Sequence, residues 1–280
     1  MHIRCVFFRK LGNGMRKMIK AIKSILRNFL PRSVRTHHIW CGLLRGQTIV
    51  TSWYDYPAAI LGYTERPLLD WFAQNVSTGQ TWLDIGAHYG YTSVALSCLV
   101  GKSGRIFAFE PMLVTAGYVT RTRQLNNFPQ LTVVPYGLAV PETIAMVKLP
   151  TTRGMVDSTI ERTPNDETQE EWLETILVAR LDWLWPRICG ADVRIDGVKI
   201  DVQGMEIEAL TGMIDILRSQ HPKLVIELHR GVDREKFFHT IELAGYSRHA
   251  ISIEPVGGEV STLYMDDHSY FFHKSSEAGI

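Results

Sequence analysis

The chain has 280 residues, of which 45% are hydrophobic and 21% are charged, and its formal net charge is +1. This length fits one large domain that buries a full core without disulfides or metals, and the composition is typical of a soluble globular protein. Beyond residue 54 the chain carries 19 basic and 29 acidic residues, a balance that argues against a nucleic-acid-binding protein.

The first 54 residues form a basic segment. It holds 11 of the 30 Lys and Arg residues and no acidic residue, because the first carboxylate of the chain is that of Asp55. A basic arm on an acidic body indicates an anionic contact for the arm, such as lipid headgroups or a partner. We therefore divide the chain into a basic N-terminal arm, residues 1–54, and a domain of residues 55–280.

Residues 15–30 of the arm, MRKMIKAIKSILRNFL, have the periodicity of an amphipathic helix that ends at Pro31. One interpretation is an interfacial helix that lies on an anionic membrane. We favour the other, a helix that packs on the domain or on a second subunit, because most amphipathic helices are simply packed helices. Met15 is an alternative start to Met1, and the sequence does not decide between them.

No secretory or membrane-spanning segment is recognisable in the sequence. The N-terminus lacks an apolar signal-peptide core with a small-residue cleavage site, and no apolar run approaches the roughly 18 residues of a membrane span. The four cysteines are far apart and form no C-x-x-C pair, so we expect reduced thiols, with Cys98 buried in an apolar helix. These features predict a cytoplasmic chain, peripheral at the inner membrane surface if the arm binds lipid.

From residue 66 onward, helical and strand patterns alternate. Helices are predicted over residues 66–76, 91–100, 114–126, 205–219 and 233–244, and strands over 81–85, 105–109, 131–135, 197–202, 224–228, 249–253 and 269–273. This alternation predicts an α/β fold with a mostly parallel sheet and helices on both faces, which binds ligands at the carboxyl ends of its strands. Residues 141–195 interrupt the alternation with polar stretches, which predicts a lid above the site or an excursion over the sheet edge.

A glycine-containing loop follows the first predicted core strand. The candidate cofactor-binding residues in it are Asp84, Ile85, Gly86, Ala87, His88 and Gly90. The two glycines permit a sharp turn and the close approach of a ligand. The spacing differs from the G-x-G-x-x-G dinucleotide fingerprint, and the carboxylate of Asp84 disfavours a pyrophosphate. A ligand with an amino-acid tail and a sulfonium fits better, with Asp84 as acceptor for its ammonium group.

An acidic residue also ends the next predicted strand. Glu110 lies 20 residues after Gly90 in the segment FAFEP and is followed by Pro111. A carboxylate at this position can accept hydrogen bonds from both hydroxyls of a ribose. The loop and this acid together, in the order strand, turn, helix, strand, indicate a nucleoside-binding site.

These segments and several others resemble the FkbM family of methyltransferases over about residues 79–245. TWLDIGAHYGYTS is similar to the family's D-V/I-G-A-N-x-G loop, FAFEP to its A-F-E-P, and VARLDWL to its T-L-D element. GVKIDVQGMEIEALTGM is similar to its I-K-I-D-V-E-G-x-E element, and KLVIELH to its strand ending in E-x-H. The resemblance implies a Rossmann-like, seven-stranded class I methyltransferase fold and S-adenosylmethionine as cofactor. It also implies O-methylation of a small-molecule or glycan acceptor, at a hydroxyl of a saccharide or natural product.

Two residues depart from the family pattern. His88 stands where the family usually has Asn, so we expect an altered contact between this loop and the cofactor. Gln203 stands where the family usually has Glu, which keeps the hydrogen-bonding reach of the side chain but removes its charge. If that charge serves the site, catalysis or metal affinity is weakened.

The last two motifs place polar side chains at the ends of neighbouring strands. Lys199 and Asp201 share one strand face, as do Glu227 and His229 on the next strand, and we expect both pairs and Glu206 to converge. Either Asp201 or His229 is the candidate base that removes a hydroxyl proton. Lys199 and Glu206 alternatively form a local pair that fixes the loop, and His229 is alternatively a structural histidine. The carboxylates allow a divalent metal, but their spacing demands none.

Three functions remain open from the sequence. The leading interpretation is an S-adenosylmethionine-dependent O-methyltransferase. An NAD-linked oxidoreductase is disfavoured by Asp84 and by the missing dinucleotide fingerprint. A catalytically inactive binding or scaffold protein that keeps the fold is suggested by His88 and Gln203.

Overall fold

The computed structural model describes residues 29–152, 155–156, 173–190, 192–254 and 264–275. Residues 15–28 of the predicted amphipathic helix lie outside these ranges, so both interpretations of that helix stay predictions. Within the described ranges, no helix is both long and apolar enough to cross a membrane.

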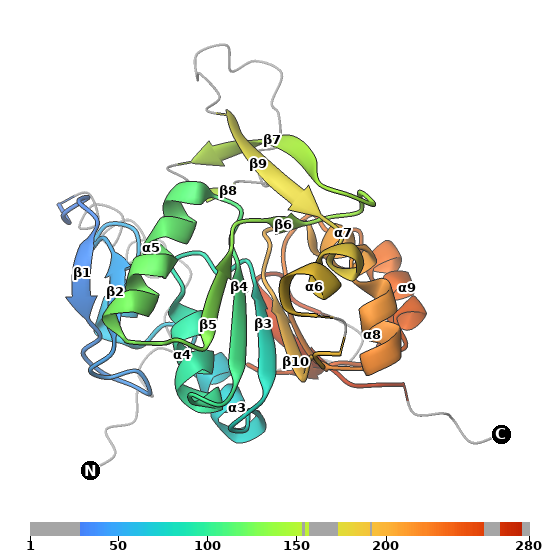
Figure 1. Cartoon of the computed structure of the whole chain (residues 1–280), viewed down its shortest axis with the longest axis horizontal. Coiled ribbons are helices and arrows are strands. Elements are labelled where there is room, and N and C mark those ends of the chain that lie inside the picture. The colour runs from blue at the N-terminus through green and yellow to red at the C-terminus, as the bar shows by residue number, and fades with distance from the viewer. Residues whose placement is uncertain (1–28, 153–154, 157–172, 191, 255–263, 276–280) are drawn as a thin grey trace, which may run out of the picture.

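A seven-stranded sheet forms the centre of the molecule (Figure 1). Its strands are, in spatial order, β12 (Ile251–Ser252), β13 (His268–Phe272), β11 (Lys223–Leu228), β10 (Gly197–Ile200), β3 (Thr81–Ile85), β4 (Arg105–Phe109) and β5 (Leu131–Val134). The five strands from β11 to β5 run parallel, and β13 is antiparallel to both of its neighbours. The strand order reverses between β3 and β10, where a ligand site is expected. The prediction of a mostly parallel, seven-stranded sheet is confirmed.

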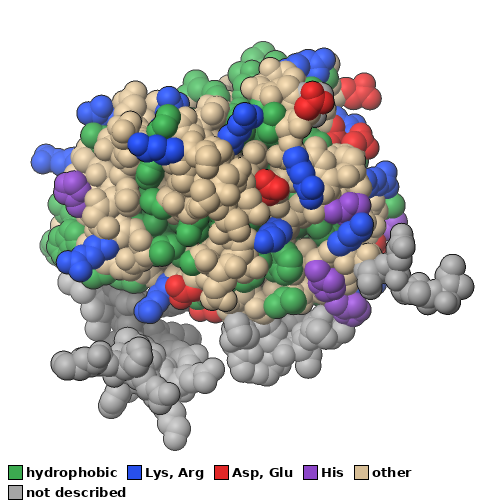
Figure 2. Space-filling view, turned by 60° about the horizontal axis from the view of Figure 1, so that its bottom comes forward, with side chains coloured by type: hydrophobic (Ala, Val, Ile, Leu, Met, Phe, Trp, Pro, Cys, Tyr) green, Lys and Arg blue, Asp and Glu red, His purple; other side chains and the backbone are tan. Residues whose placement is uncertain are grey.

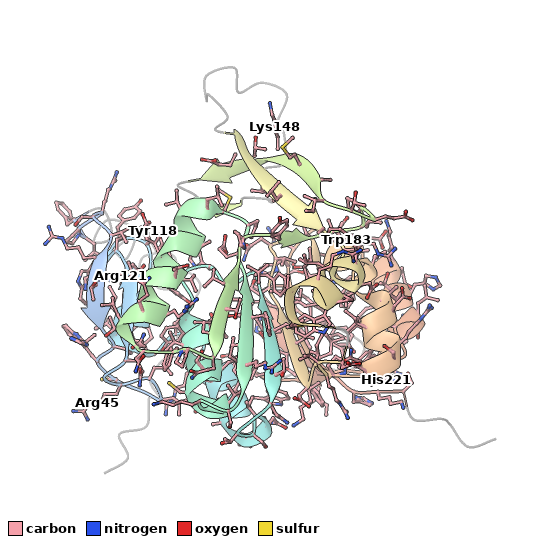
Figure 3. The ribbon with its side chains drawn as sticks, viewed as in Figure 1. Arg45, Tyr118, Arg121, Lys148, Trp183 and His221 are labelled. Atoms are coloured by element: carbon pink, nitrogen blue, oxygen red, sulfur yellow. The ribbon has the colours of Figure 1, made fainter. Side chains whose placement is uncertain are left out.

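Helices cover both faces of this sheet. One face packs against α6 (Leu181–Cys189), α7 (Glu206–Thr211), α8 (Ile214–Gln220) and α9 (Arg234–Leu243), and the other against α3 (Arg66–Asn75), α4 (Tyr91–Val100) and α5 (Leu113–Leu125). Successive residues of β3 point to opposite faces, so Leu83 packs in the first layer and Trp82 in the second. Side chains fill the space between sheet and helices on both sides (Figure 3). Burial on both faces explains why the strands are continuously apolar.

An N-terminal hairpin and a short helix pack beside α5 and α4. They are β1 (Arg35–His38), β2 (Thr48–Thr51) and α2 (Pro57–Leu61). The backbone N–H of Val50 donates to the Thr122 hydroxyl at 3.0 Å, and the Asn126 side chain exchanges two hydrogen bonds of 2.7 Å with the backbone of Thr48. The described part of the basic arm therefore packs against the domain.

A smaller sheet lies over one end of the central sheet (Figure 1). Its order is β6 (Gly137–Leu138), β9 (Leu173–Ala179), β7 (Ala145–Thr152) and β8 (Met155–Val156). β6 pairs parallel with β9, and β9 pairs antiparallel with β7. Most of this sheet belongs to the segment 141–195 that interrupts the alternation in the sequence.

The outer surface mixes charged and uncharged side chains. On the face shown in Figure 2, Lys and Arg side chains stand apart from one another among uncharged ones, so no basic patch gathers there. Large apolar side chains are also exposed, including Leu113, Val114 and Met146. The expected absence of a nucleic-acid partner stays a prediction.

The predicted helix over residues 205–219 is wrong, because the chain forms two helices there, α7 and α8. The carboxylate of Asp182 accepts hydrogen bonds from the backbone N–H groups of Asp215 at 3.3 Å and Ile216 at 3.0 Å, and so starts a new helix. The backbone of Gly212 lies against the carbonyl oxygen of Ala139, where a Cβ would collide. Tertiary contacts therefore break a pattern that is helical by periodicity alone.

Two smaller predictions also need correction. Cys98 is exposed rather than buried, because its neighbours Ser97 and Val100 occupy the buried face of α4. The predicted strand over residues 249–253 is reduced to the two residues of β12.

We expect Asp182→Ala to lower the free energy of unfolding by about 1–2 kcal/mol, because the first turn of α8 loses its acceptor. Chemical denaturation measures this loss. Asp215→Ala is the control, since the side chain of Asp215 is 70% exposed and its change leaves the two backbone donors in place. Equal losses in both variants would show that Asp182 does not hold the helix start.

Candidate functional site

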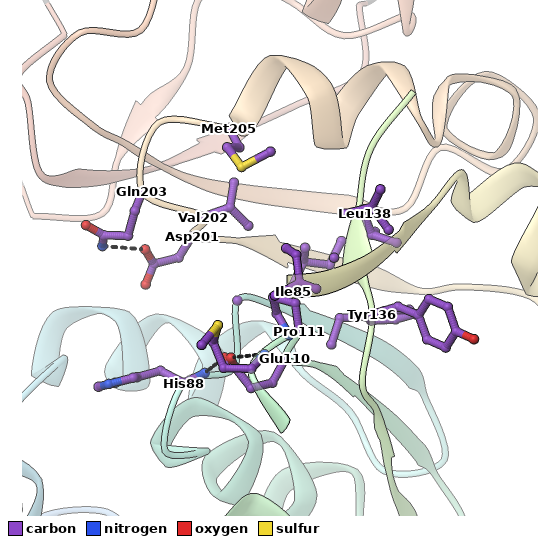
Figure 4. A pocket seen from close by; sticks show the side chains of 16 residues that line it. Ile85, His88, Glu110, Pro111, Tyr136, Leu138, Asp201, Val202, Gln203 and Met205 are labelled. Atoms are coloured by element: carbon purple, nitrogen blue, oxygen red, sulfur yellow. Dashed lines mark hydrogen bonds between the residues drawn. The ribbon is translucent and has the colours of Figure 1, made fainter. Parts of the chain in front are cut away.

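A cavity of about 150 Å³ opens at the carboxyl ends of β3, β4 and β10, where the strand order reverses (Figure 4). Its polar wall comes from the loop after β3, the end of β4 and the turn after β10, and its apolar wall includes β6 and β9. The predicted site residues that line it are Ile85, Gly86, His88, Glu110, Pro111 and Asp201. The other predicted residues, Asp84, Ala87, Gly90, Lys199, Glu206, Glu227 and His229, are not among those that line it.

The loop after β3 is pressed against the end of β10. Gly86 has a φ of +81°, and a Cβ there would collide with the backbone oxygen of Asp201. The N–H groups of Gly86 and Ala87 both donate to the carbonyl oxygen of Phe109 at 3.0 Å. Burial lowers the pKa of His88 to about 4, so its imidazole is neutral. The loop therefore presents backbone and an uncharged ring to the cavity.

Glu110 faces the cavity from the end of β4. One carboxylate oxygen accepts from the backbone N–H of His88 at 2.8 Å, and the other from that of Met112 at 3.0 Å. Burial raises the pKa of Glu110 to about 7, although both hydrogen bonds oppose this shift. Because each carboxylate oxygen has a second lone pair, Glu110 can still accept two hydroxyl hydrogens.

Asp84 is fully buried and points inward rather than into the cavity. It accepts from the Ser93 hydroxyl at 2.5 Å and lies 3.2 Å from the ammonium nitrogen of Lys199. The predicted contact between Asp84 and a ligand ammonium group is therefore not provided by this arrangement. Asp84 instead holds a lysine of the neighbouring strand.

Lys199 joins the two strand ends. Its Nζ lies 3.2 Å from Asp84, 3.3 Å from Asp201 Oδ2 and 3.4 Å from the carbonyl oxygen of Gly86. Burial alone would lower the pKa of this ammonium, but Asp201 and Asp84 outweigh it and raise the pKa of Lys199. Burial alone would raise the pKa of Asp201, but Lys199 and His229 outweigh it and lower that pKa. Lys199 and Asp201 are therefore both charged.

Asp201, Glu206, Glu227 and His229 converge as predicted from their spacing. His229 Nε2 lies 3.4 Å from Asp201 Oδ1 and 3.5 Å from Glu227 Oε1, while its Nδ1 lies 2.7 Å from Glu206 Oε1. Because a carboxylate only accepts, Nδ1 carries the hydrogen and Nε2 of the neutral ring has the lone pair. Burial alone would lower the pKa of His229, but the hydrogen bond to Glu206 and the nearby carboxylates raise it. Burial and the charge of Asp201 raise the pKa of Glu227 to about 8.

Gln203 covers this cluster on the cavity side. It has a φ of +53°, and its amide nitrogen lies 2.9 Å from His229 Nε2 and 3.4 Å from Asp201 Oδ1. Its amide hydrogens therefore point at two acceptors when the ring is neutral. Gln203 and Asp201 line the cavity, and His229 lies behind them.

Sequence reasoning missed the apolar half of the cavity. Phe109, Met112, Leu138, Ile176 and Val178 line it, and they come from β4, the turn after it, and the small sheet. The apolar run ILVA within residues 173–179 was the available signal, since it is typical of a strand in an otherwise polar segment. The cavity thus joins an apolar slot, a carboxylate and a polar cluster, which suits an aromatic nucleoside with its reacting group at the polar end.

The sequence matches the family model described as "Methyltransferase FkbM domain" over residues 84–249. No curated protein matches the sequence. Among solved structures, the methyltransferase FkbM from Methylobacillus flagellatus is 18% identical, with 72% of this chain and 50% of that chain covered and a TM-score of 0.45. The match thus spans half of that longer protein.

Two further solved structures are similar at low identity. The SAM-dependent O-methyltransferase from Thermotoga maritima is 12% identical, with 83% of this chain and 75% of that chain covered and a TM-score of 0.44. Fibrillarin from Aeropyrum pernix, which was crystallised with natively bound S-adenosyl-L-methionine, is 13% identical, with 86% and 88% covered and a TM-score of 0.44.

We expect Lys199→Met to lower the free energy of unfolding by roughly 3–5 kcal/mol, because it leaves the buried carboxylate of Asp84 without a cation. The double variant Asp84→Asn/Lys199→Met should recover part of this loss, since it removes the unpaired charge. Lys102→Met, at an exposed lysine, is the control and should change little. Chemical denaturation measures the unfolding free energies of all three variants. If Lys199→Met loses no more unfolding free energy than the control, Lys199 and Asp84 do not form a stabilising buried pair.

The raised pKa of Glu110 predicts a pH-dependent contribution to stability. The folded protein holds the proton up to about pH 7, whereas the unfolded chain releases it near 4.5. The contribution is therefore complete below pH 4.5 and is lost as the pH rises through about 7, by an amount of about 3 kcal/mol. Glu110→Gln cannot titrate, so the unfolding free energy of the wild type should fall more steeply between pH 5 and 8 than that of the variant. If the unfolding free energies of the wild type and the variant change equally with pH, the pKa of Glu110 is not raised.

Proposed function

This chain belongs to the FkbM methyltransferase family, and we propose that it transfers a methyl group from S-adenosylmethionine to a hydroxyl oxygen of a saccharide or natural product. The observation that carries the proposal is a single cavity whose wall contains both Glu110 and Asp201. One carboxylate suits the ribose of the cofactor, and the other belongs to a polar cluster that can activate a hydroxyl.

The cofactor half of the site is made by Glu110, the loop after β3 and the apolar slot. Glu110 accepts the ribose hydroxyls, and the side chains of Met112, Ile176 and Val178 offer apolar contact to the adenine ring. Gly86 lets the loop after β3 pack directly against the backbone of Asp201, because a Cβ there would collide with it. S-adenosylmethionine supplies an electrophilic methyl group on a sulfonium.

The chain's main contribution to the reaction is positioning. The new bond joins the acceptor oxygen to the methyl carbon, while the bond from that carbon to sulfur breaks and its electrons remain on sulfur. Holding the two reactants in line can supply roughly 7–11 kcal/mol of the barrier. The hydroxyl must also lose its proton, and an alcohol does not ionise readily near neutral pH.

The cluster at the polar end is where this hydroxyl is activated. Of the two candidate bases, Asp201 is the weaker, because Lys199 holds its pKa low. His229 offers the more basic atom, because Glu206 accepts from Nδ1 and raises the pKa of the ring. We therefore assign activation to the cluster around His229 Nε2, with Asp201 and Glu227 beside it.

Mutations should separate cofactor binding from methyl transfer, because different residues serve the two. We expect Glu110→Ala to weaken S-adenosylmethionine binding at least tenfold by calorimetry, because the ribose loses its acceptor. We expect His229→Ala to bind the cofactor within about threefold of the wild type but to transfer methyl groups about 10²–10⁴-fold more slowly. Turnover is followed as labelled methyl incorporation into a panel of saccharides and hydroxylated natural products.

His239→Ala, at an exposed histidine of α9, is the control and should match the wild type in both assays. Unchanged cofactor affinity in Glu110→Ala would remove the cofactor assignment. Normal turnover in His229→Ala would remove the assignment of the cluster.

A further inference from the structure

Three donor side chains from the ends of two neighbouring strands face one another beside the cavity. Asp201, Glu227 and His229 each offer one ligand atom, and these atoms all lie within 4.8 Å of one another. They stand at the ends of β10 and β11, which pair directly as parallel neighbours. We propose that these three side chains bind one divalent cation.

The separations suit such a cation. Ligands at right angles around an ion lie about 3.0 Å apart for bonds of about 2.1 Å, and about 3.4 Å apart for bonds of about 2.4 Å. His229 Nε2 is 3.4 Å from Asp201 Oδ1 and 3.5 Å from Glu227 Oε1. Both separations from the imidazole nitrogen therefore match those expected for the larger of these bond lengths.

The imidazole is oriented as a ligand. His229 is almost completely buried, and its Nδ1 lies 2.7 Å from Glu206, whose side chain is fully buried behind it. A metal-binding histidine almost always donates its other ring hydrogen to a carboxylate or carbonyl, which fixes the tautomer. In this arrangement the lone pair of Nε2 is on the side of the ring away from Glu206, where Gln203, Asp201 and Glu227 approach it.

The ammonium of Lys199 approaches the cluster from the far side of Asp201. Lys199 contacts Asp84 and the Oδ2 atom of Asp201, which leaves Oδ1 directed toward His229 Nε2. The other oxygen of Glu227 is approached by the Ser269 hydroxyl at 3.5 Å, so Oε1 is the one that faces the cluster. Two carboxylate oxygens and an imidazole nitrogen thus share a space that a cation stabilises.

Gln203 completes the donor set. Its amide nitrogen contacts both His229 Nε2 and Asp201 Oδ1, so the amide group occupies the edge of the same space. Turning the amide by 180° about its last side-chain bond brings its oxygen there, and an amide oxygen is a ligand for hard cations. Glutamine in place of the family's usual glutamate therefore keeps a fourth oxygen ligand with one negative charge fewer.

The role of the cation, unlike its binding, rests on the proposed function. A divalent cation supplies Lewis-acid chemistry, which makes a nearby hydroxyl more acidic. The nitrogen of His229 then acts as a ligand rather than as the proton acceptor, and the hydroxyl proton leaves to solvent. The cluster that we assign to activation serves the reaction whether His229 accepts the proton or binds the cation.

Mn²⁺ binding to the full, tag-free chain tests the proposal without any methyl acceptor. We expect one Mn²⁺ per chain, detected as loss of the free-ion signal in electron paramagnetic resonance. Glu227→Gln and His229→Gln should each weaken this binding at least tenfold, and Glu235→Gln should not change it, since that side chain is 89% exposed on α9. Circular dichroism and S-adenosylmethionine calorimetry verify that the variants are folded.

The outcomes separate this proposal from the proposed function. Site-specific Mn²⁺ binding supports the cation site even if no acceptor is methylated. Absence of binding, or equal binding by the wild type and both ligand variants, overturns it. Full methyl transfer after treatment with a chelator also overturns the catalytic role of the cation, while leaving the methyltransferase assignment intact.

Discussion

The buried ammonium of Lys199 is the interaction on which the rest of the site depends. Lys199 and Asp84 lie opposite each other in the pairing of β10 with β3, and the lysine reaches from there to Asp201. An isolated buried charge of either sign is costly, so the pairing of these groups stabilises the site. The same nitrogen also contacts the carbonyl oxygen of Gly86. One cation thus ties the loop after β3 to the turn after β10.

This cation also explains why two carboxylates at the ends of parallel strands behave differently. Glu110 follows β4 and pairs with no cation among the described residues, and burial raises its pKa to about 7. Asp201 follows β10 beside Lys199, and its pKa is held below the usual value. A nearly neutral acceptor at one end of the cavity and a fixed negative charge at the other suit a ligand that is polar but uncharged at its ribose and cationic at its reacting atom.

The sequence was sufficient to predict those features that depend on local patterns. The ends of β3, α4 and β4 agree with the predicted bounds, because buried strands and a helix stopped by Gly101 leave clear periodic signals. The convergence of Asp201, Glu227 and His229 followed from strand alternation. The inward orientation of Asp84 did not, because it depends on the register between strands that are more than 100 residues apart. The break at Gly212 and the apolar wall from β9 likewise depend on contacts that periodicity does not record.

The two departures from the family pattern preserve the contacts that matter most for the site. Glu110 is held by the backbone N–H of His88, so the identity of that side chain does not alter this hydrogen bond. Gln203 reaches both Asp201 and His229 through its amide, and so keeps the cluster assembled without a further negative charge. Membership of a methyltransferase family leaves the NAD-linked alternative without support.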